Sequence, residues 1–345
     1  MSKKLRIGMI GCGEIAYKAT GHSIRASTNA EMVVAMDPVE EVARSFGEAF
    51  GVEATTGVDA VLSSPDVDAV VISTPHYLHA PLTIAAAQAG KHVMVEKPIA
   101  CTLEQADAMI AACRKAGVLL AVNLVSRYDP DAAQAKEWIA QGAIGKIIAC
   151  KFHAASNKPD SYWTGGYTGR VQTVWRKSKE QSGGGMLIMN LVHDIDRFRY
   201  ITGLEAVRVY AEYDTYATDV EVEDFITLSI RYDNGAIGNL MASSCARGNE
   251  GTGNRIYGTE GQIIFDRDKL RIYTNRETEG LQSGAWNEVQ VPVIDARQVF
   301  IERFADAWSE GRTPDIPGEE GRKTLEVIYA AYRSGEIHQP VSLPM

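Results

Sequence analysis

LRIGMIGCGEIA, residues 5–16, is the stretch of sequence that decides the fold. Its first half, Leu5–Ile10, is a mostly apolar run, typical of a strand that is buried on both faces of a sheet. Gly11, Gly13 and Ala16 follow in the spacing G-x-G-x-x-A, at the start of a helical pattern. The first glycine permits a tight turn, the second lets a pyrophosphate approach the helix N-terminus, and the alanine lets the helix pack close to the sheet. This stretch predicts a nucleotide-binding β-α unit.

Strand-like and helical patterns alternate from this point to about residue 125. Strands are expected at Met32–Met36, Ala69–Ser73, His92–Val95 and Leu119–Asn123, and helices at Glu14–Ala26, Val39–Phe50, Leu78–Ala89 and Leu103–Ala116. Strands that alternate with helices through short links pair in parallel through right-handed crossovers. Residues 1–125 are therefore predicted to form a doubly wound, Rossmann-type domain.

The pattern changes in the second part of the chain, where strands dominate. We expect strands at Ile147–Ala154, Ala206–Tyr213, Phe225–Tyr232, Ala236–Ser243, Gln262–Phe265 and Leu270–Tyr273, and helices at Asp131–Gln141, Met186–Ile201, Gln298–Glu310 and Glu319–Arg333. Asp233-Asn234-Gly235 is a hairpin signal. The predicted fold class is α/β, with an α+β domain at residues 126–345 built on a large, mostly antiparallel open sheet. Its C-terminal helices could pack back on the first domain.

Composition excludes several classes of protein. The 345-residue chain carries 35 Lys plus Arg against 44 Asp plus Glu, a formal net charge of -9, and has no basic stripe for nucleic acid. No apolar run approaches the ~18–20 residues of a membrane span, and Ile7–Ile10 is too short for a signal peptide core. The five cysteines are scattered, without a C-x-x-C pair, which indicates reduced thiols in a cytoplasmic protein and no zinc site.

Asp37 bears on the choice of cofactor. It ends the second expected strand, about 20 residues beyond the fingerprint, where an acid accepts hydrogen bonds from the ribose 2′-hydroxyl of NAD. The same carboxylate would repel the 2′-phosphate of NADP, and no Arg or Lys follows it directly. NAD is therefore favoured over NADP. The alternative is a glycine turn and a strand-end acid in a sheet that binds no nucleotide.

Candidate chemistry lies at two further places. Lys97, in Glu96-Lys97-Pro98, follows the fourth strand, and ligands of open α/β sheets sit at the carboxyl ends of strands. A surface lysine in a turn is the alternative. Asn190, His193, Asp194 and Arg197 share one helix face after Gly183–Gly185, and imidazole suits proton transfer near neutral pH. A solvated face would produce the same pattern.

Two other features are less specific. His76 and His79 follow the third strand, but no further ligand cluster supports a metal; one of them could line the nicotinamide region, or serve in packing or capping. Residues 155–185 form a long stretch without clear periodicity, typical of a lid or binding loop, or of a surface excursion.

The chain resembles the Gfo/Idh/MocA oxidoreductases, the group of glucose–fructose oxidoreductase and inositol dehydrogenase. The matching segments are IGMIGCGEIA (7–16), VVISTPHYLHAPLTIAAAQAGKHVMVEKPIA (70–100), TVWRKSKEQSGGGMLIMNLVHDID (173–196) and YGTEGQIIFD (257–266). The resemblance implies that Lys97 and His193 are the catalytic residues. Family members often carry an Asp four residues before the histidine, where this chain has Met189; Asn190 or Asp194 could orient the substrate instead. Arg127, Trp175 and Arg176 match places that often face the substrate.

These expectations define a hypothesis about the reaction. An alcohol gives a hydride to NAD, His193 accepts the proton and Lys97 stabilises the alkoxide, or the two exchange roles. The predicted cofactor site comprises Gly11, Gly13, Glu14, Ile15, Asp37, Ser73, Thr74, Pro75, His79, Glu96 and Lys97. The predicted substrate site comprises Arg127, Trp163, Trp175, Arg176, Asn190 and Asp194.

Aromatic and polar side chains between Asn157 and Trp175 suit a sugar, cyclitol or sugar derivative, although a partner subunit could use the same loop. A homodimer or homotetramer through the second sheet is expected. The alternative function is a non-catalytic regulator that senses a dinucleotide.

Overall fold

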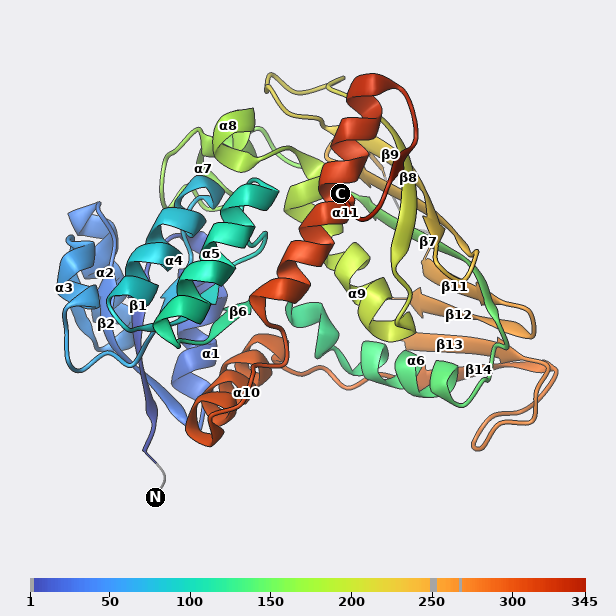
Figure 1. The fold of residues 1–345 in the computed structure, drawn as a ribbon, viewed down its shortest axis with the longest axis horizontal. Helices are drawn as coiled ribbons and strands as arrows, with labels where there is room; N and C mark the ends of the chain where they lie inside the picture. The colour runs from blue at the N-terminus through green and yellow to red at the C-terminus, as the bar shows by residue number, and fades with distance from the viewer. Residues whose placement is uncertain (1–2, 249–252, 267–268) are drawn as a thin grey trace. The chain divides into compact units, whose positions relative to one another are not determined.

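The computed structural model describes residues 3–248, 253–266 and 269–345, and these form two compact units (Figure 1). Unit 1 comprises residues 1–125, 159–184 and 295–325, and unit 2 comprises 126–158, 185–294 and 326–345. The predicted boundary after residue 125 is thus one of several points at which the chain passes between units. Residues 159–184 and 295–325, which the sequence places in the second domain, belong to unit 1.

A six-stranded parallel sheet, sheet A, forms the centre of unit 1. Its strands are β1 (Leu5–Ile10), β2 (Ala30–Met36), β3 (Glu53–Thr55), β4 (Ala69–Ile72), β5 (His92–Val95) and β6 (Leu120–Val122). Their order is β3-β2-β1-β4-β5-β6, so the strands are added on one side of β1 up to β3 and on its other side from β4 onward. This order is that of the dinucleotide-binding Rossmann fold, so the predicted fold class is confirmed.

Helices cover both faces of sheet A. They are η1 (Ala16–Thr20) with α1 (Gly21–Ala26), α2 (Glu40–Phe50), α3 (Val58–Leu62), η2 (His76–Leu78) with α4 (His79–Gln88), and α5 (Leu103–Ala116). Right-handed crossovers that lead outward in opposite directions put α1 and α2 on one face and α4 and α5 on the other. Figure 1 shows α4 and α5 side by side. The segment 295–325 adds α10 (Ala296–Glu310), which packs beside α1.

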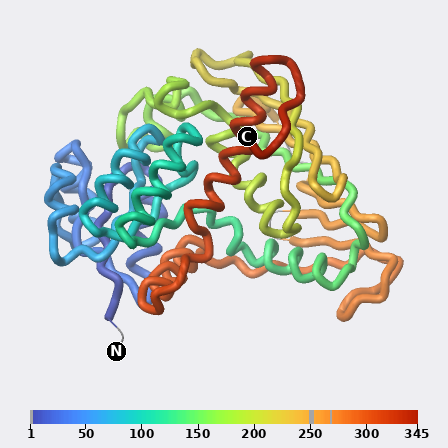
Figure 2. Tube along the Cα trace, viewed as in Figure 1, coloured from blue at the N-terminus to red at the C-terminus, as the bar shows by residue number. Residues whose placement is uncertain are grey.

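The segment 159–184 contains only short helical turns, α7 (Tyr162–Gly165), η4 (Trp175–Lys177) and α8 (Lys179–Ser182). It runs as the yellow-green trace next to the blue and cyan helices of unit 1 in Figure 2. The absence of periodicity in its sequence agrees with this conformation.

A nine-stranded sheet, sheet B, forms unit 2. Its strands are β7 (Ile147–Ala155), β8 (Ala206–Asp214), β9 (Phe225–Tyr232), β10 (Ile237–Ser243), β11 (Asn254–Gly258), β12 (Gly261–Asp266), β13 (Lys269–Thr274), β14 (Ala285–Gln290) and β15 (Val341–Ser342). The order is β14-β13-β12-β11-β7-β10-β9-β8-β15. All neighbours are antiparallel except β7 and β10. The predicted mostly antiparallel sheet is confirmed.

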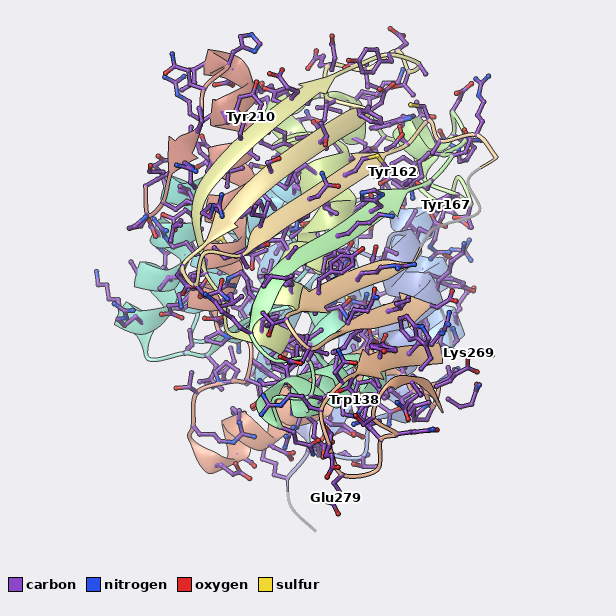
Figure 3. The ribbon with its side chains drawn as sticks, turned by 90° about the vertical axis from the view of Figure 1, so that its right-hand side faces the viewer. Trp138, Tyr162, Tyr167, Tyr210, Lys269 and Glu279 are labelled. Carbon is purple, nitrogen blue, oxygen red and sulfur yellow. The ribbon has the colours of Figure 1, made fainter. Side chains whose placement is uncertain are left out.

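Helices lie on one face of sheet B. They are α6 (Pro130–Ala140), η5 (Leu187–Leu191) continuing into α9 (Val192–Thr202), and the part of α11 (Gly318–Ile337) that belongs to unit 2. The strand side chains on this face, such as Phe152, Leu228 and Ile272, are buried. The other face is turned to the viewer in Figure 3, where Tyr210 is labelled on β8, and no described helix of unit 2 covers it.

Two properties of the described residues bear on function. None of their helices combines the length and the apolar character needed to cross a bilayer. All five cysteines are free thiols, and four of them are buried.

Candidate functional site

The fingerprint turn requires its first glycine and leaves space at its second. Gly11 has a φ of 91°, and a Cβ there would lie 2.4 Å from the Ser73 carbonyl oxygen. A Cβ on Gly13 would meet no described heavy atom within 4 Å. Helical backbone begins at Glu14, so the free N–H groups of a helix N-terminus face the space that Gly13 leaves. This arrangement fits a pyrophosphate.

Asp37 lies at the end of β2 and is buried. Its Oδ2 accepts a hydrogen bond from the Cys12 N–H at 3.0 Å, and its Oδ1 accepts one from the Val39 N–H at 3.0 Å. A carboxylate offers about four lone-pair sites, so each oxygen can accept one further hydrogen bond. The carboxylate is therefore held rigidly at the fingerprint turn and retains the capacity to bind ribose hydroxyls.

Segment 159–184 contacts the fingerprint helix within unit 1. The Tyr167 N–H donates to Glu14 Oε2 at 2.8 Å, and Lys18 Nζ binds Glu14 Oε1 at 2.7 Å. Burial of the Glu14 carboxylate raises its pKa, but these hydrogen bonds outweigh that effect, so the pKa of Glu14 is lowered. Arg170 Nε donates to the Cys12 carbonyl oxygen at 2.9 Å. Asp37 thus binds the backbone N–H of Cys12, and Arg170 binds the backbone carbonyl of the same residue.

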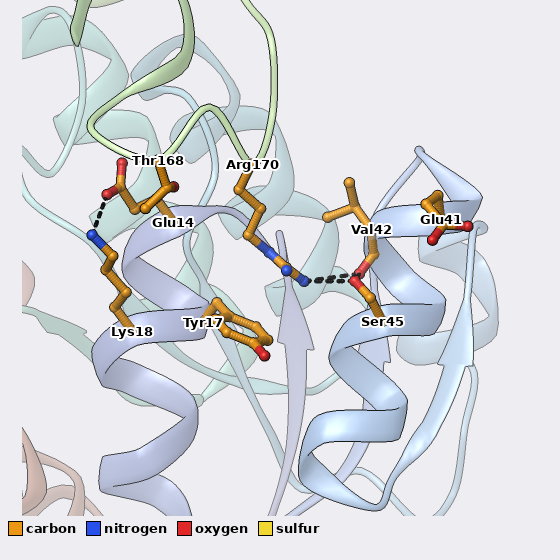
Figure 4. Close-up of a pocket in the computed structure, with 8 residues that line it drawn as sticks. All are labelled: Glu14, Tyr17, Lys18, Glu41, Val42, Ser45, Thr168 and Arg170. Carbon is orange, nitrogen blue, oxygen red and sulfur yellow. Dashed lines mark hydrogen bonds and ion pairs between the residues drawn. The ribbon is translucent and has the colours of Figure 1, made fainter. Parts of the chain in front are cut away.

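A cavity of about 410 Å³ lies beside this contact (Figure 4). The lining residues come from the fingerprint helix, from α2 and from segment 159–184: Glu14, Tyr17, Lys18, Glu41, Val42, Ser45, Thr168 and Arg170. The Arg170 guanidinium lies 4.0 Å from the centre of the Tyr17 ring and donates to Ser45 Oγ at 2.9 Å and to the Val42 carbonyl oxygen at 3.2 Å. Arg170 therefore ties α2 to the fingerprint turn.

The turn that carries Lys97 is anchored by Glu96. Glu96 Oε1 accepts a hydrogen bond from Asn123 Nδ2 at 2.6 Å and forms an ion pair with Arg297 on α10. The side chain is buried, so its carboxylate serves these partners. Lys97 itself is half-buried at the carboxyl end of β5, and Ser73, Thr74 and Pro75 follow the neighbouring β4. The predicted position of Lys97 at this edge of the sheet agrees with the structure.

His76 and His79 are buried beside this turn. His76 Nδ1 lies 2.7 Å from the Ser182 carbonyl oxygen, and its ring centre lies 4.4 Å from that of Trp175. Burial, His79, Lys97 and Arg176 all lower the pKa of His76. Unit 1 therefore groups Lys97, Trp175 and Arg176 around this histidine.

The aromatic residues of segment 159–184 pack largely on one another. The Arg176 guanidinium lies 4.5 Å from the Trp175 ring centre and 5.1 Å from that of Tyr162. Tyr162 in turn contacts Trp163, whose exposed fraction is only 2%. The pattern that suggested a sugar-binding loop thus also forms a small core for that loop.

The glycine triplet before α9 is fixed by Glu223. Its Oε2 accepts from the Gly185 N–H at 2.7 Å and its Oε1 accepts from the Leu187 N–H at 2.9 Å. A Cβ on Gly185 would lie 2.0 Å from the Glu223 carbonyl oxygen. The glycine is therefore needed because another part of this unit approaches it. The sequence does not reveal the role of Glu223, since nothing near it in the chain indicates its contact with Gly185 and Leu187.

The predicted polar stripe is present on the helix formed by η5 and α9. Asn190, His193, Asp194 and Arg197 are half-buried, whereas their helical neighbours, including Met189, are buried. A π-helical turn, Leu187–Leu191, ends two residues before His193, and such turns are frequent at functional sites. The stripe is thus neither fully solvated nor part of the core.

Asp194 and Arg197 have partners within unit 2. Asp194 Oδ1 accepts from Asn254 Nδ2 at 3.1 Å; burial raises the Asp194 pKa to about 6, against the opposing charge of Arg197. Arg197 is ion-paired with Asp131. Asn254 is a second residue that the sequence did not reveal, because it reaches Asp194 only through the packing of α9 on the sheet.

Arg127, predicted to bind substrate, is a buried ion-pair partner. Its Nε and Nη2 donate to the Asp196 carboxylate at 2.8 and 2.6 Å. Both side chains are less than a tenth exposed. This bidentate pair joins the start of unit 2 to α9.

A Rossmann sheet with an open fingerprint turn and a rigidly held acid after its second strand defines a dinucleotide-binding protein. The profile described as "Oxidoreductase family, NAD-binding Rossmann fold" matches residues 5–124, and that described as "GFO/IDH/MocA C-terminal domain" matches residues 132–264. The chain belongs to the GFO/IDH/MocA family of NAD-binding oxidoreductases. The predicted family, enzyme class and cofactor are confirmed.

Several named relatives are similar over the whole chain. The 1,5-anhydro-D-fructose reductase of Ensifer adhaerens is 31% identical, with 98% of each chain covered. The scyllo-inositol 2-dehydrogenase (NAD(+)) of Bacillus subtilis is 28% identical, with 99% of this chain and 97% of the relative covered. A solved levoglucosan dehydrogenase in complex with NADH and levoglucosan has a TM-score of 0.85 at 28% identity, covering 99% of this chain and all of that one.

Proposed function

We propose that the protein transfers a hydride between NAD and a secondary alcohol of a sugar, cyclitol or sugar derivative. The observation that carries this proposal is the pairing of an open fingerprint turn at Gly13 with Lys97 at the carboxyl edge of the same sheet. The named substrates of the relatives, an anhydro sugar, an inositol and levoglucosan, support the substrate class.

The cofactor is held by residues of unit 1 in this proposal. The N–H groups at Gly13, Glu14 and Ile15 bind the pyrophosphate, and the remaining lone pairs of Asp37 accept the ribose hydroxyls. We also propose that the cofactor contacts other residues predicted at this edge of the sheet: Gly11, Ser73, Thr74, Pro75, Glu96 and Lys97. The ring of His79, the remaining predicted contact, is fully buried, which favours an indirect role for it. When bound, NAD supplies the carbon that accepts or returns the hydride. The carboxylate of Asp37 disfavours a 2′-phosphate.

Lys97 and His193 are the proposed catalytic residues. His193 accepts the hydroxyl proton, and Lys97 stabilises the developing alkoxide; exchanged roles remain the alternative. Lysine at its reference pKa of about 10.4 is a poor base at pH 7, which favours the hydrogen-bond donor role for Lys97. Asn190 and Asp194 orient the substrate where relatives often carry an Asp in place of Met189.

The remaining proposed substrate contacts differ in their support. Arg176, half-buried beside Trp175, is available to a substrate hydroxyl from its position in the loop. Trp163 and Trp175 would contribute ring surface. Arg127 is committed to Asp196, which favours an indirect role for it.

The test of catalysis is a pair of substitutions. Lys97→Met and His193→Ala should each lower kcat by roughly 10²–10⁴-fold, because positioned acid–base groups contribute that much. Lys115→Met and His92→Ala, which change a lysine and a histidine of unit 1 outside the proposed site, should leave kcat near the wild-type value. If both Lys97→Met and His193→Ala retain near-normal turnover, the assignment is wrong.

The test of substrate class is a screen of sugars, inositols and anhydro sugars, followed by the absorbance of reduced nicotinamide with NAD and with NADP. Reduction of NAD by a polyol supports the enzyme. Binding of NAD without turnover of any compound would instead support the dinucleotide-sensing regulator.

The uncovered face of sheet B is the proposed oligomer interface. Tyr210, Ile237 and Trp286 on this face have exposed fractions of 36%, 48% and 43%. Apolar side chains on an open sheet face favour association with a second copy. We propose a homodimer or homotetramer in the cytoplasm. Light scattering at micromolar concentration should give a multiple of the 37.6 kDa chain mass, and a monomer would refute the proposal.

A further inference from the structure

His79 contacts two turns that both lie at the carboxyl ends of strands of sheet A. The ring is fully buried. Its Nδ1 lies 2.8 Å from the Pro98 carbonyl oxygen, and its Nε2 lies 3.1 Å from the Thr74 carbonyl oxygen. Thr74 follows β4, and Pro98 follows Lys97 after β5. A single side chain therefore bridges the turns that end two adjacent strands.

Both partners of the ring are backbone carbonyls, which only accept hydrogen bonds. A neutral imidazole carries one N–H, so only one of the two contacts can be donated at a time. The shorter contact, to Pro98, identifies Nδ1 as the donor. We propose that His79 is a positioning residue, whose Nδ1–H fixes the Pro98 carbonyl and thereby the backbone that carries Lys97.

The charges around the ring agree with a neutral state. Burial lowers the pKa of His79, the two carbonyl acceptors and Glu96 raise it, and Lys97 lowers it. His76, whose ring centre lies 5.6 Å away, is the other titratable group beside it, and burial lowers its pKa too. With a neutral ring the Nδ1–H bond to Pro98 is retained throughout the neutral pH range.

His79 therefore has a positioning role in place of the cofactor contact expected from the sequence. A buried ring whose two nitrogens face backbone carbonyls acts on the reaction through Lys97, and not by touching the cofactor. Because a displacement of a catalytic group by about 1 Å can lower the rate ~10²-fold, loss of the bond should reduce kcat and leave NAD binding almost unchanged. This kinetic consequence rests on the proposed function, whereas the hydrogen bond does not.

The kinetic test uses three substitutions that separate the two ring nitrogens. An asparagine amide nitrogen occupies nearly the place of Nδ1, and a glutamine amide nitrogen nearly that of Nε2. His79→Phe, which keeps the ring and loses both nitrogens, should lower kcat about 10–100-fold, with the KM for NAD changed less than about threefold. His79→Asn should recover most of that loss, and His79→Gln should not. His92→Gln, at the other end of β5, is the control.

Two kinetic results would overturn the proposal. A rise in the NAD KM with unchanged kcat would make His79 a cofactor contact. Equal behaviour of His79→Asn and His79→Gln, or a loss of thermal stability alone, would reduce it to packing.

A second measurement needs neither turnover nor a folded variant. Nitrogen-15 NMR of the wild-type protein with NAD, labelled at histidine, reports which ring nitrogen carries the proton. We expect the Nδ1–H form at pH 7. The Nε2–H form would place the hydrogen bond on Thr74 and would reject the proposal, even if no polyol reduced NAD and the proposed function itself had failed.

Discussion

The helix that follows the fingerprint and the helix that carries His193 begin in similar ways and serve different purposes. Each follows closely spaced glycines, and each contains a π-helical turn near its start, Ala16–Thr20 in the first and Leu187–Leu191 in the second. In front of the first helix, a Cβ on Gly13 would meet open space. At the second helix, a Cβ on Gly185 would collide with the Glu223 backbone.

This difference shows how one local sequence pattern supports two kinds of chemistry. The first helix leaves its terminal N–H groups to an external anion. In the second, Glu223 already accepts the Gly185 and Leu187 N–H groups, so that terminus is satisfied by the protein itself. The chemistry that we propose for the second helix lies on its side face, at His193. Glycine before a helix therefore indicates that another group comes close to the backbone there. Only the tertiary structure decides whether that group is a ligand or a carboxylate of the protein.

The largest expected effect concerns the ion pair that supports the second helix. Arg127→Met leaves the Asp196 carboxylate buried without its bidentate partner, which costs about 3 kcal/mol of folding free energy. Urea unfolding should report this loss, and NAD affinity should stay within about twofold. Arg322→Met, which removes an exposed ion pair with Asp107, should cost below about 1 kcal/mol. A normal stability with a raised substrate KM would instead make Arg127 a substrate contact.

The glycine of the second helix should be intolerant of a methyl group. Gly185→Ala places a Cβ 2.0 Å from the Glu223 carbonyl oxygen, so the helix or the loop that carries Glu223 must move. We expect a loss of about 1–3 kcal/mol, as for overpacked cores, and a fall in kcat because His193 moves with the helix. Gly203→Ala, just after the same helix, separates backbone strain from steric collision. Its Cβ would meet no described atom within 4 Å, but its φ of 70° is strained for alanine. Equal kcat in Gly185→Ala and wild type would contradict the expectation.

Most of the fold could be predicted because its strands are apolar and its helices are amphipathic. The missed strands show the limit. Three of them, β3 (Glu53–Thr55), β14 (Ala285–Gln290) and β15 (Val341–Ser342), lie at sheet edges, where one side of the strand has no neighbour and half-exposed polar residues are tolerated. The fourth, β11 (Asn254–Gly258), is central in sheet B, but it is short and begins with the polar residues Asn254 and Arg255. All four lack the hydrophobic pattern by which the other strands are recognised.

The site was predictable where spacing along the chain determines geometry. The stripe from Asn190 to Arg197 follows from helical periodicity, and the position of Lys97 follows from the end of a parallel strand. Glu223 and Asn254 could not be found in this way, since each meets its partner only after the sheet and the helix have packed. Arg127 shows the converse: family resemblance suggested a substrate contact, and the Asp196 partner appears only in three dimensions.

Gly13, before the first helix, should tolerate a methyl group in the folded protein without ligand, but not in the complex with NAD. Gly13→Ala should change the melting temperature little, because the added Cβ meets no described atom within 4 Å. It should weaken NAD binding at least tenfold, about 1.4 kcal/mol, because the methyl group occupies the space left for the pyrophosphate. Calorimetric titration with NAD measures the effect. Unchanged affinity would mean that the phosphates bind elsewhere, and the contrast with Gly185 would then lose its functional meaning.

The smallest expected effect concerns the charge on the side face of the second helix. Because burial raises the Asp194 pKa from 3.8 to about 6, the folded protein keeps this proton to a higher pH than the unfolded chain does. The contribution of Asp194 to stability therefore falls as pH rises from about 4 to 6, and the full penalty, about 1–2 kcal/mol for a half-buried group, is present at pH 7.

Asp194→Asn removes that charge and still offers an oxygen to the Asn254 amide. The variant should be about 1–2 kcal/mol more stable than wild type at pH 7, and the gain should shrink toward zero near pH 4. Urea unfolding at several pH values measures the difference, with Asp233→Asn in the exposed hairpin turn as the control. If the gain does not depend on pH, the carboxylate is not desolvated, and the second helix would present a solvated face instead of a functional one.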